Sequence, residues 1–420
     1  MNKIFSFAML AGVVCLTACS SDDIVKDDLR EIKLAVDVAG SRAFTAIDVP
    51  AGSVFYVWAD QYIDKQDDPA EISPFLKAWK LTATGDAQGN LQTLSPKTFP
   101  SQNNLIFYVM KGNFVDNCII NNADMTTKEV LTENVNLFPA QMVMPAGTDP
   151  LQVGIEHQLI ADQRTENTRA FAQSDLVYGE AWGEDGKGVP PAYEAIRLQG
   201  YHMLSQFEVV LHPGYKADSL TLVGENTELT ITNMLTTALL TPDTLKKHKI
   251  YGTNNDEAFD ITNAVHRGQI IHPMGSATAI QMDKVVSTDF NRANLKPGKV
   301  IVVPQTVPAG TAIITLTLDA NDQDKRHSIV YKLPADFTFK SGYKYRFNLT
   351  INDGHEIILD PTYVAPNNDY ESQDIYDSDS DGWAEVNISK VLEEATEQQE
   401  IELDPSSVDW NEENRDLYMQ

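Results

Sequence analysis

The amino-acid sequence predicts an all-β protein built of two tandem antiparallel β-sandwich domains with an acidic C-terminal extension. Three observations predict this fold class. Many short apolar runs either alternate with a period of two or are rich in aromatic and β-branched residues, as strands are. Gly, Pro and Asn separate these runs as turn signals. The 3.6-residue spacing of an amphipathic helix is found only at residues 388–398.

The expected strands follow one another along most of the chain. Residues 32–38 largely alternate apolar and polar side chains, which indicates a half-buried strand. Residues 54–59 and 105–110 are compact apolar runs that are too short for typical helices, so we expect buried strands there. Further strands are expected at residues 207–211, 219–223, 229–232, 300–303, 312–318 and 343–351. Many short strands with turn signals between them are typical of antiparallel sandwiches.

The domain boundary is expected where composition changes. Residues 183–191 are rich in Gly, Pro and charge, and we place one sandwich at residues 43–185 and the other at 190–360. Residues 361–420 form the acidic extension, with 17 Asp or Glu against Lys390 and Arg415. The resulting net charge of −15 is more than half of the −28 of the whole chain. Such a chain repels phosphate backbones, which excludes nucleic acid as a partner.

The first residues predict export. A positive start at Lys3 precedes an apolar run at residues 4–16, which is too short to span a bilayer and is typical of a secretory signal. The run ends in Leu16-Thr17-Ala18-Cys19, which resembles the bacterial lipobox. That resemblance implies a signal peptide at residues 1–18 and acylation of Cys19, with the lipid as the link to the outer membrane. The alternative is an ordinary signal-peptidase site that happens to contain a cysteine.

The four residues after the cysteine bear on the final location. Ser20-Ser21-Asp22-Asp23 resembles the acidic signal that sends Bacteroidetes lipoproteins to the cell surface. The alternative is a simple solvated linker. With Cys15 in the signal and Cys19 carrying lipid, only Cys118 remains, so no disulfide can form within the mature chain. Cys118 is most simply a small buried side chain.

Patterns that carry enzymatic chemistry are missing from the sequence. The eight histidines have no metal-ligand spacing, and there is no nucleophile elbow, phosphate loop or dinucleotide fingerprint. We therefore expect no enzyme and no cofactor. One weak metal candidate is Asp377, Asp379 and Asp381 before Gly382, which is how a calcium loop begins. Its twelfth position is Ile388 instead of a bidentate Glu, so a solvated acidic turn is the alternative.

Several short motifs follow the lipobox in a fixed order. In the first predicted domain they are Ser41-Arg42-Ala43-Phe44, residues 55–59, residues 75–79, Thr98-Phe99-Pro100, residues 105–110 and residues 174–178. In the second they are residues 198–206, Val302-Val303-Pro304-Gln305 and residues 339–345. This order resembles the fimbrillin family of Bacteroidetes, the subunits and accessory proteins of lipoprotein-derived pili. Members often end soon after the last of these motifs, whereas this chain continues to Gln420.

The resemblance implies a maturation step. In such pilins an arginine-specific protease removes the first strand, and a strand from a neighbouring subunit fills the vacated groove. Here residues 19–42 would be the lipidated propeptide, and the bond between Arg42 and Ala43 would be cut. The removable strand would bury a shared face made by four aliphatic side chains: Ile32, Leu34, Val36 and Val38. The alternatives are that Arg42 is a surface arginine in a linker, or that the cut follows Arg30.

The resulting functional prediction is a structural or adhesive subunit of a surface pilus (fimbrium). Its expected partners are other pilus subunits, the outer membrane through Cys19, and ligands on host or bacterial surfaces. Within the acidic extension, Ile401 and Leu403 alternate with acidic residues and predict a donor strand, with a solvated cap on a terminal subunit as the alternative. The competing function is a surface glycan-binding lipoprotein of a nutrient-uptake system, which would need exposed tryptophans. Trp58 and Trp79 lie in or next to strands and are expected to be buried, which leaves Trp182, Trp383 and Trp410 as the candidates for exposure.

Overall fold

The computed structural model describes the strands and the loops that connect most of them. The residues described are 30–38, 50–64, 71–120, 128–130, 153–167, 169–183, 187–213, 227–242, 269–287, 297–324, 326–352, 356–359, 384–386, 388 and 392. Almost all regular structure among them is strand, and α1 (Ala170–Ser174) is a five-residue helix. The all-β prediction is confirmed. Most strand pairs are antiparallel, and three pairs are parallel: β1 with β10, β11 with β21, and β21 with β23.

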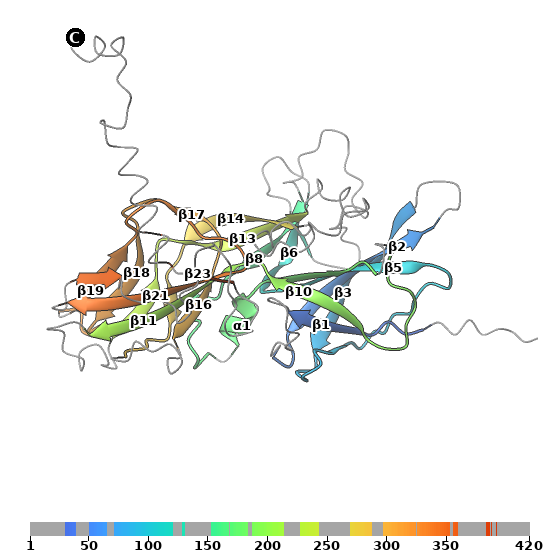
Figure 1. Cartoon of the computed structure of the whole chain (residues 1–420), viewed down its shortest axis with the longest axis horizontal. Helices are drawn as coiled ribbons and strands as arrows, with labels where there is room; N and C mark the ends of the chain where they lie inside the picture. Colours follow the sequence, from blue (N-terminus) through green and yellow to red (C-terminus); the bar gives the residue numbers. More distant parts are fainter. Residues whose placement is uncertain are drawn as a thin grey trace, which may run out of the picture.

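The N-terminal part of the molecule is a seven-stranded sheet, seen at one end of Figure 1. Its order is β1 (Leu34–Val38), β10 (Ile196–His202), β9 (Val177–Ala181), β5 (Asn104–Lys111), β2 (Val54–Ile63), β3 (Glu71–Ala83) and β4 (Leu91–Gln92). Isolated bridges join Ala35 to Asn90 and Glu31 to Thr98, so the first and last strands of the sheet meet. The sheet therefore curls around its own core.

Alternating side chains divide this sheet into two buried faces. Phe55 and Val57 of β2 lie in the inner cluster, which Leu34, Trp79 and Phe107 also join. Trp58, which follows Val57 and points to the opposite face, belongs to the larger cluster that continues into the C-terminal half. Burial of both faces explains why residues 54–59 of β2 and 105–110 of β5 are apolar without a break and do not alternate with polar residues.

A second sheet joins the two halves of the chain. Its order is β14 (Gln269–Ala277), β13 (Leu235–Pro242), β8 (Val153–Gln158), β6 (Phe114–Ile120) and β7 (Lys128–Val130). Strands β6, β7 and β8 precede the boundary predicted at residues 185–190, whereas β13 and β14 follow it. The ladder between β13 and β8 pairs four residues on each strand, from Thr237 opposite Gln158 to Leu240 opposite Ile155. The two halves thus share this connecting sheet.

The C-terminal half is a sandwich of two sheets (Figure 1). One contains β16 (Gly298–Val302), β11 (Ser205–Pro213), β21 (Tyr343–Asn352) and β22 (Glu356–Leu359), with β23 (Ala384–Val386) beside β21. The other contains β15 (Ile280–Met282), β12 (Glu228–Ile231), β18 (Ala312–Leu318) and β19 (His327–Lys332), and β17 (Thr306–Val307) pairs separately with β20 (Phe337–Thr338). Phe347 meets Tyr331 edge to face at 6.0 Å, which packs one sheet on the other.

Helical conformation is rare among the described residues. α1 is far too short to cross a bilayer, and no other helix within the described ranges is long and apolar enough to do so. Ile388 and Leu392, from the stretch predicted to be helical, have helical conformation and are each 1% exposed. The strand expected at residues 219–223 lies outside the described residues.

Candidate functional site

The first strand, β1, lies between two distant segments of the N-terminal sheet and is hydrogen-bonded to both. On one side β1 runs parallel to β10, from Leu34 opposite Ile196 to Val38 opposite Gly200. On the other side, the amide of Ile32 donates to the carbonyl oxygen of Lys97 at 2.8 Å, and that of Val36 donates to Gly89 at 3.0 Å. Residues 30–38 therefore fill a groove between β10 and the segment 89–99. We call this the β1 groove.

The side chains of this strand complete the inner core. Ile32, Leu34 and Val36 are 3%, 1% and 1% exposed and belong to the cluster that contains Trp79 and Phe107. Burying three aliphatic side chains contributes about 4–9 kcal/mol, at about 1.5–3 kcal/mol each. That is comparable with the total stability of a typical domain, about 5–15 kcal/mol. The side chain of Val38 lies outside the described residues.

A glycine turn lets the sheet approach the strand closely. Gly89 has φ +66°, and a Cβ atom there would collide with the carbonyl oxygen of Val36. Asp86 holds this turn, because its Oδ1 accepts hydrogen bonds from the amides of Gln88 at 3.1 Å and Asn90 at 3.0 Å. The bonds from Asn90 are the main reason that the pKa of Asp86 is lowered to about 2. Gly85, Asp86, Gly89 and Asn90 are typical turn residues in the sequence, but nothing in the sequence indicates their contact with residues 32–38.

Of the two candidate cleavage sites, the structure describes only Arg30. Arg42 and Ala43 lie outside the described residues. Arg30 is described, and its surroundings hold it on both sides: Nη1 donates to the carbonyl oxygen of Pro191 at 2.5 Å, and the guanidinium lies 4.3 Å from the centre of the Tyr193 ring. Its own carbonyl oxygen accepts from the amide of Phe99 at 2.9 Å. The Arg30 peptide is therefore held in the β1 groove by the hydrogen bond to Phe99.

A buried group of charges lies where α1 meets the N-terminal sheet. The ammonium of Lys111 donates to the carbonyl oxygen of Ala172 at 2.5 Å and to the Asp175 carboxylate at 3.3 Å. The other oxygen of Asp175 lies 2.9 Å from Nδ1 of His202. Burial raises the pKa of Asp175, but the charges and hydrogen bonds of His202 and Lys111 outweigh it and hold the pKa below its usual range. These charges link β5, β10 and α1.

His157 on β8 extends this polar group into the connecting sheet. Its Nε2 lies 2.9 Å from the carbonyl oxygen of Ser174 and therefore carries the proton. Its Nδ1 is buried with no hydrogen-bond partner. Burial is the main cause that lowers the pKa of His157 to about 4. Sequence reasoning missed this group, because its members are far apart along the chain and no local pattern signals their contact.

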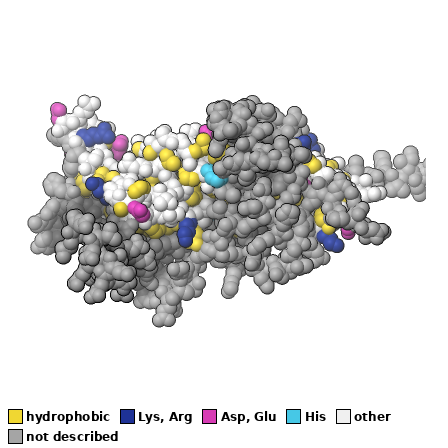
Figure 2. All heavy atoms as spheres, turned by 90° about the horizontal axis from the view of Figure 1, so that it is seen from above, with side chains coloured by type: hydrophobic (Ala, Val, Ile, Leu, Met, Phe, Trp, Pro, Cys, Tyr) yellow, Lys and Arg dark blue, Asp and Glu magenta, His cyan; other side chains and the backbone are white. Residues whose placement is uncertain are grey.

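The remaining predicted sites lie outside the described residues: Cys19, the acidic run Asp377, Asp379 and Asp381, and the side chain of Cys118. Within the ranges that are described, no three His, Cys, Asp or Glu side chains gather as a metal site would require. On the face in Figure 2 the described acidic and basic side chains are scattered and form no single patch.

The tryptophans bear on the competing glycan-binding function. Trp58 and Trp79 are 0% and 2% exposed, as their place in strands predicted. Trp182 packs edge to face on Tyr108 at 5.8 Å. Trp383 and Trp410 lie outside the described residues. The part of the chain that the structure describes thus presents no flat row of exposed tryptophans.

Three solved structures match this chain at low identity. A candidate cell adhesion protein from Bacteroides ovatus has 10% identity and a TM-score of 0.43, covering 79% of this chain and 95% of its own. A fimbrial protein from Bacteroides vulgatus has 12% identity and a TM-score of 0.34, with coverages of 78% and 98%. A fimbrial assembly protein from Parabacteroides distasonis has 12% identity and a TM-score of 0.32, with coverages of 79% and 100%.

The family assignment has a separate basis. A comparison with curated proteins finds no match. A family model described as fimbrillin-like matches residues 137–364, just over half of the 420 residues. The matched region includes strands β8, β13 and β14 of the connecting sheet, α1 and nearly all of the C-terminal sandwich. The chain therefore belongs to the fimbrillin-like family.

Proposed function

We propose that this chain is a structural and adhesive subunit of a surface pilus, exported as an outer-membrane lipoprotein on Cys19 and assembled by strand exchange after proteolytic maturation. Membership of the fimbrillin-like family supports a pilus or adhesin role at the cell surface and a non-enzymatic one. One observation supports the finer proposal: β1 completes the inner core, but both of its neighbours come from distant parts of the chain.

That connectivity decides what a cut would do. β2, the next strand in sequence, lies four places away from β1 in the sheet order. Once the link between them is broken, no covalent bond ties β1 to the groove. Arg42 is the only basic residue in residues 39–53. A cut after Arg42 would therefore free the whole strand, whereas a cut after Arg30 would leave it attached to the subunit.

An emptied β1 groove would expose apolar side chains and unpaired backbone groups, and such an edge pairs readily with another strand. We place the donor strand in residues 393–420. Two features support this choice: β23 already pairs with β21 of the same chain, and Leu392 is 1% exposed, so the preceding residues are engaged in their own subunit. Beyond them, Ile401 and Leu403 alternate with acidic residues.

The maturation proposal is tested with purified protein and an arginine-specific protease. We expect a new N-terminus at Ala43, loss of residues up to Arg42, and polymer formation. Arg42→Lys should block all three, because the protease does not accept lysine. Arg30→Lys is the matched control and should polymerise like the unmodified chain. Polymer formation by Arg42→Lys that matches the unmodified chain would contradict the proposed cut.

The donor proposal has its own test. Replacing both Ile401 and Leu403 with Asp should leave cleavage at Arg42 intact but greatly reduce polymer yield, because charged side chains cannot enter an apolar groove. Val408→Asp adds an acidic residue outside the alternating segment and serves as the control. Unchanged polymer yield from the double variant would assign the extension the role of a solvated cap.

Lipid attachment is tested separately in cells. Labelled fatty acid should be incorporated into the unmodified protein and into Cys15→Ala, but not into Cys19→Ala. Cys19→Ala should also appear in soluble fractions. Label in the Cys19→Ala protein would exclude the proposed anchor.

A further inference from the structure

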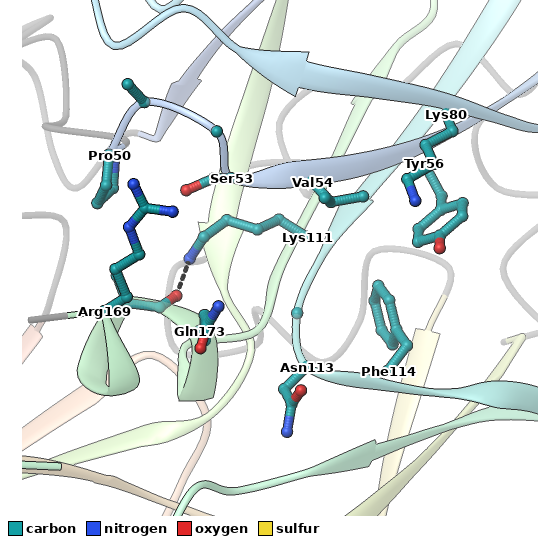
Figure 3. A pocket seen from close by; sticks show the side chains of 14 residues that line it. Pro50, Ser53, Val54, Tyr56, Lys80, Lys111, Asn113, Phe114, Arg169 and Gln173 are labelled. Carbon is teal, nitrogen blue, oxygen red and sulfur yellow. Dashed lines mark hydrogen bonds between the residues drawn. The ribbon is translucent and has the colours of Figure 1, made fainter. Parts of the chain in front are cut away.

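A pocket opens on the N-terminal half and shares no lining residue with the β1 groove. Its cavity volume is about 220 Å³. The turn at residues 50–53, strands β2 and β3, the turn between β5 and β6, and α1 contribute to its wall. Figure 3 shows Arg169 and Gln173 at one end and the rings of Tyr56 and Phe114 at the other, with Lys80 beside Tyr56. The pocket thus has a polar, basic end and an aromatic end.

The charge of the pocket is positive. Lys80, Lys111 and Arg169 line it, and none of the lining residues that the structure describes is Asp or Glu. Lys111 is already engaged by Asp175 and by the carbonyl oxygen of Ala172. Arg169 and Lys80 are exposed and form no ion pair among the described residues. On a chain with a net charge of −28, two such cations in one small pocket favour an anionic ligand.

The aromatic end narrows the choice of ligand. Tyr56 and Phe114 are partly exposed, and their ring centroids lie 5.8 Å apart at an interplanar angle of 65°. Such rings pack well against the C–H face of a sugar ring. The arginine fork binds a planar carboxylate with two parallel hydrogen bonds, and the Gln173 amide can bond hydroxyl groups. The volume is below the about 300–1,000 Å³ of pockets for drug-sized ligands, which limits the ligand to about one sugar ring.

We propose that this pocket binds one carboxylate-bearing sugar residue, of the uronic acid type, in a surface polysaccharide. Arg169 holds the carboxylate, Lys80 adds positive charge, and Tyr56 with Phe114 supports the ring. An extended acidic peptide would need a longer groove than this cavity offers. The inference rests on the adhesive role proposed above, for which it supplies the chemical class of ligand.

The test is calorimetric titration of the full chain, before any protease treatment, with methyl glucuronide. Methyl glucoside, which lacks the carboxylate, and acetate, which lacks the ring, are the ligand controls. We expect methyl glucuronide to bind, and Arg169→Gln and Lys80→Gln each to weaken it about tenfold or more, as loss of a charge-assisted contact does. Lys77→Gln, on the same strand as Lys80 but outside the pocket, should bind like the unmodified chain.

Three outcomes would overturn the proposal: no binding of methyl glucuronide at millimolar concentration, equal binding of methyl glucoside or acetate, or full affinity in Arg169→Gln. A synthetic peptide of residues 393–420 that binds through Arg169 where methyl glucuronide does not would also overturn it and assign the pocket to the extension. Polymer formation is measured on the same variants and should be unaffected. A failure of sugar binding is thereby distinguished from a failure of pilus assembly.

Discussion

The amide nitrogen of Val36 lies 3.0 Å from the carbonyl oxygen of Gly89, and this hydrogen bond joins the first strand to a turn at the opposite edge of the same sheet. A Cβ atom on Gly89 would collide with the carbonyl oxygen of Val36. The close contact between β1 and this turn therefore requires glycine at position 89. A substitution of Gly89 tests the contact without changing β1.

We expect Gly89→Ala to destabilise the protein for two reasons. The left-handed backbone at φ +66° costs about 1–2 kcal/mol for an L-residue. The collision with Val36 adds about 1–3 kcal/mol, as overpacking does. Gly310→Ala is the matched control, because Gly310 has φ +78° and open space around its Cβ position. Thermal or urea unfolding should show a larger loss for Gly89→Ala. Equal losses would mean that the sheet yields to the extra methyl group.

Leu34→Ala should lower the free energy of unfolding by about 2–5 kcal/mol, because it leaves a cavity at a core position that is 1% exposed. Lys33→Ala changes an exposed neighbour and should alter stability by less than about 0.5 kcal/mol. Urea unfolding of uncut protein measures both. A Leu34→Ala loss no greater than that of Lys33→Ala would show that the strand contributes little to the inner core.

Asp175→Asn should destabilise the protein by about 3–5 kcal/mol, because it leaves the buried ammonium of Lys111 without its carboxylate partner. Asp162→Asn is the control, since its ion pair with Arg164 has side chains that are about a third exposed. Such a pair contributes about 0–1 kcal/mol. Chemical unfolding at neutral pH compares the two. Similar losses would argue that Asp175 is compensated by other groups.

His157 makes stability depend on pH. Its pKa is lowered from 6.5 to about 4 in the folded chain, so the unfolded chain takes up the proton first as pH falls. The free energy of unfolding is therefore unaffected by His157 above pH 6.5 and falls as pH falls towards 4. The total loss is about 3 kcal/mol. Asp175 does not share this window, because a carboxyl with a lowered pKa loses its contribution only below about pH 4.

The pH effect is isolated with His157→Gln, which keeps a donor for the Ser174 carbonyl but cannot titrate. Urea unfolding at pH 7 and pH 4.5 should show a smaller stability loss for this variant than for the unmodified chain. His272→Gln, on β14 and only half-buried, should retain the original pH dependence. An identical loss in His157→Gln would assign the effect to other groups.

The strands could be predicted because their side chains report burial directly. Residues 105–110 are apolar throughout, since β5 is buried on both faces, whereas residues 343–351 within β21 alternate apolar and polar side chains. The partners of each strand could not be predicted, because periodicity carries no information on distant neighbours. Residues 198–206 show this well: Ile196–His202 pairs with β9 and β1, whereas Ser205–Pro213 enters the C-terminal sandwich, with fully buried Met203 and Leu204 between them.

The candidate site was only partly visible in the sequence. The shared face of Ile32, Leu34 and Val36 followed from alternation, and the structure buries all three. The groove around them is built from residues 89–99 and from β10, whose positions depend on the closure of the whole sheet. The pairing of Lys111 with Asp175 joins positions 64 residues apart, and no local pattern signals such a pair.

The connecting sheet has a mechanical consequence for a filament subunit. Where two domains are joined only by a linker, tension between them passes through one stretch of backbone. Here β8 and β13 come from opposite sides of residues 185–190 and share four paired positions within one hydrogen-bonded ladder. Pulling the halves apart must break several of these bonds and expose the fully buried Ile155 and Leu240 to water. We therefore expect the two halves to stay together under tension and to separate abruptly at a threshold force.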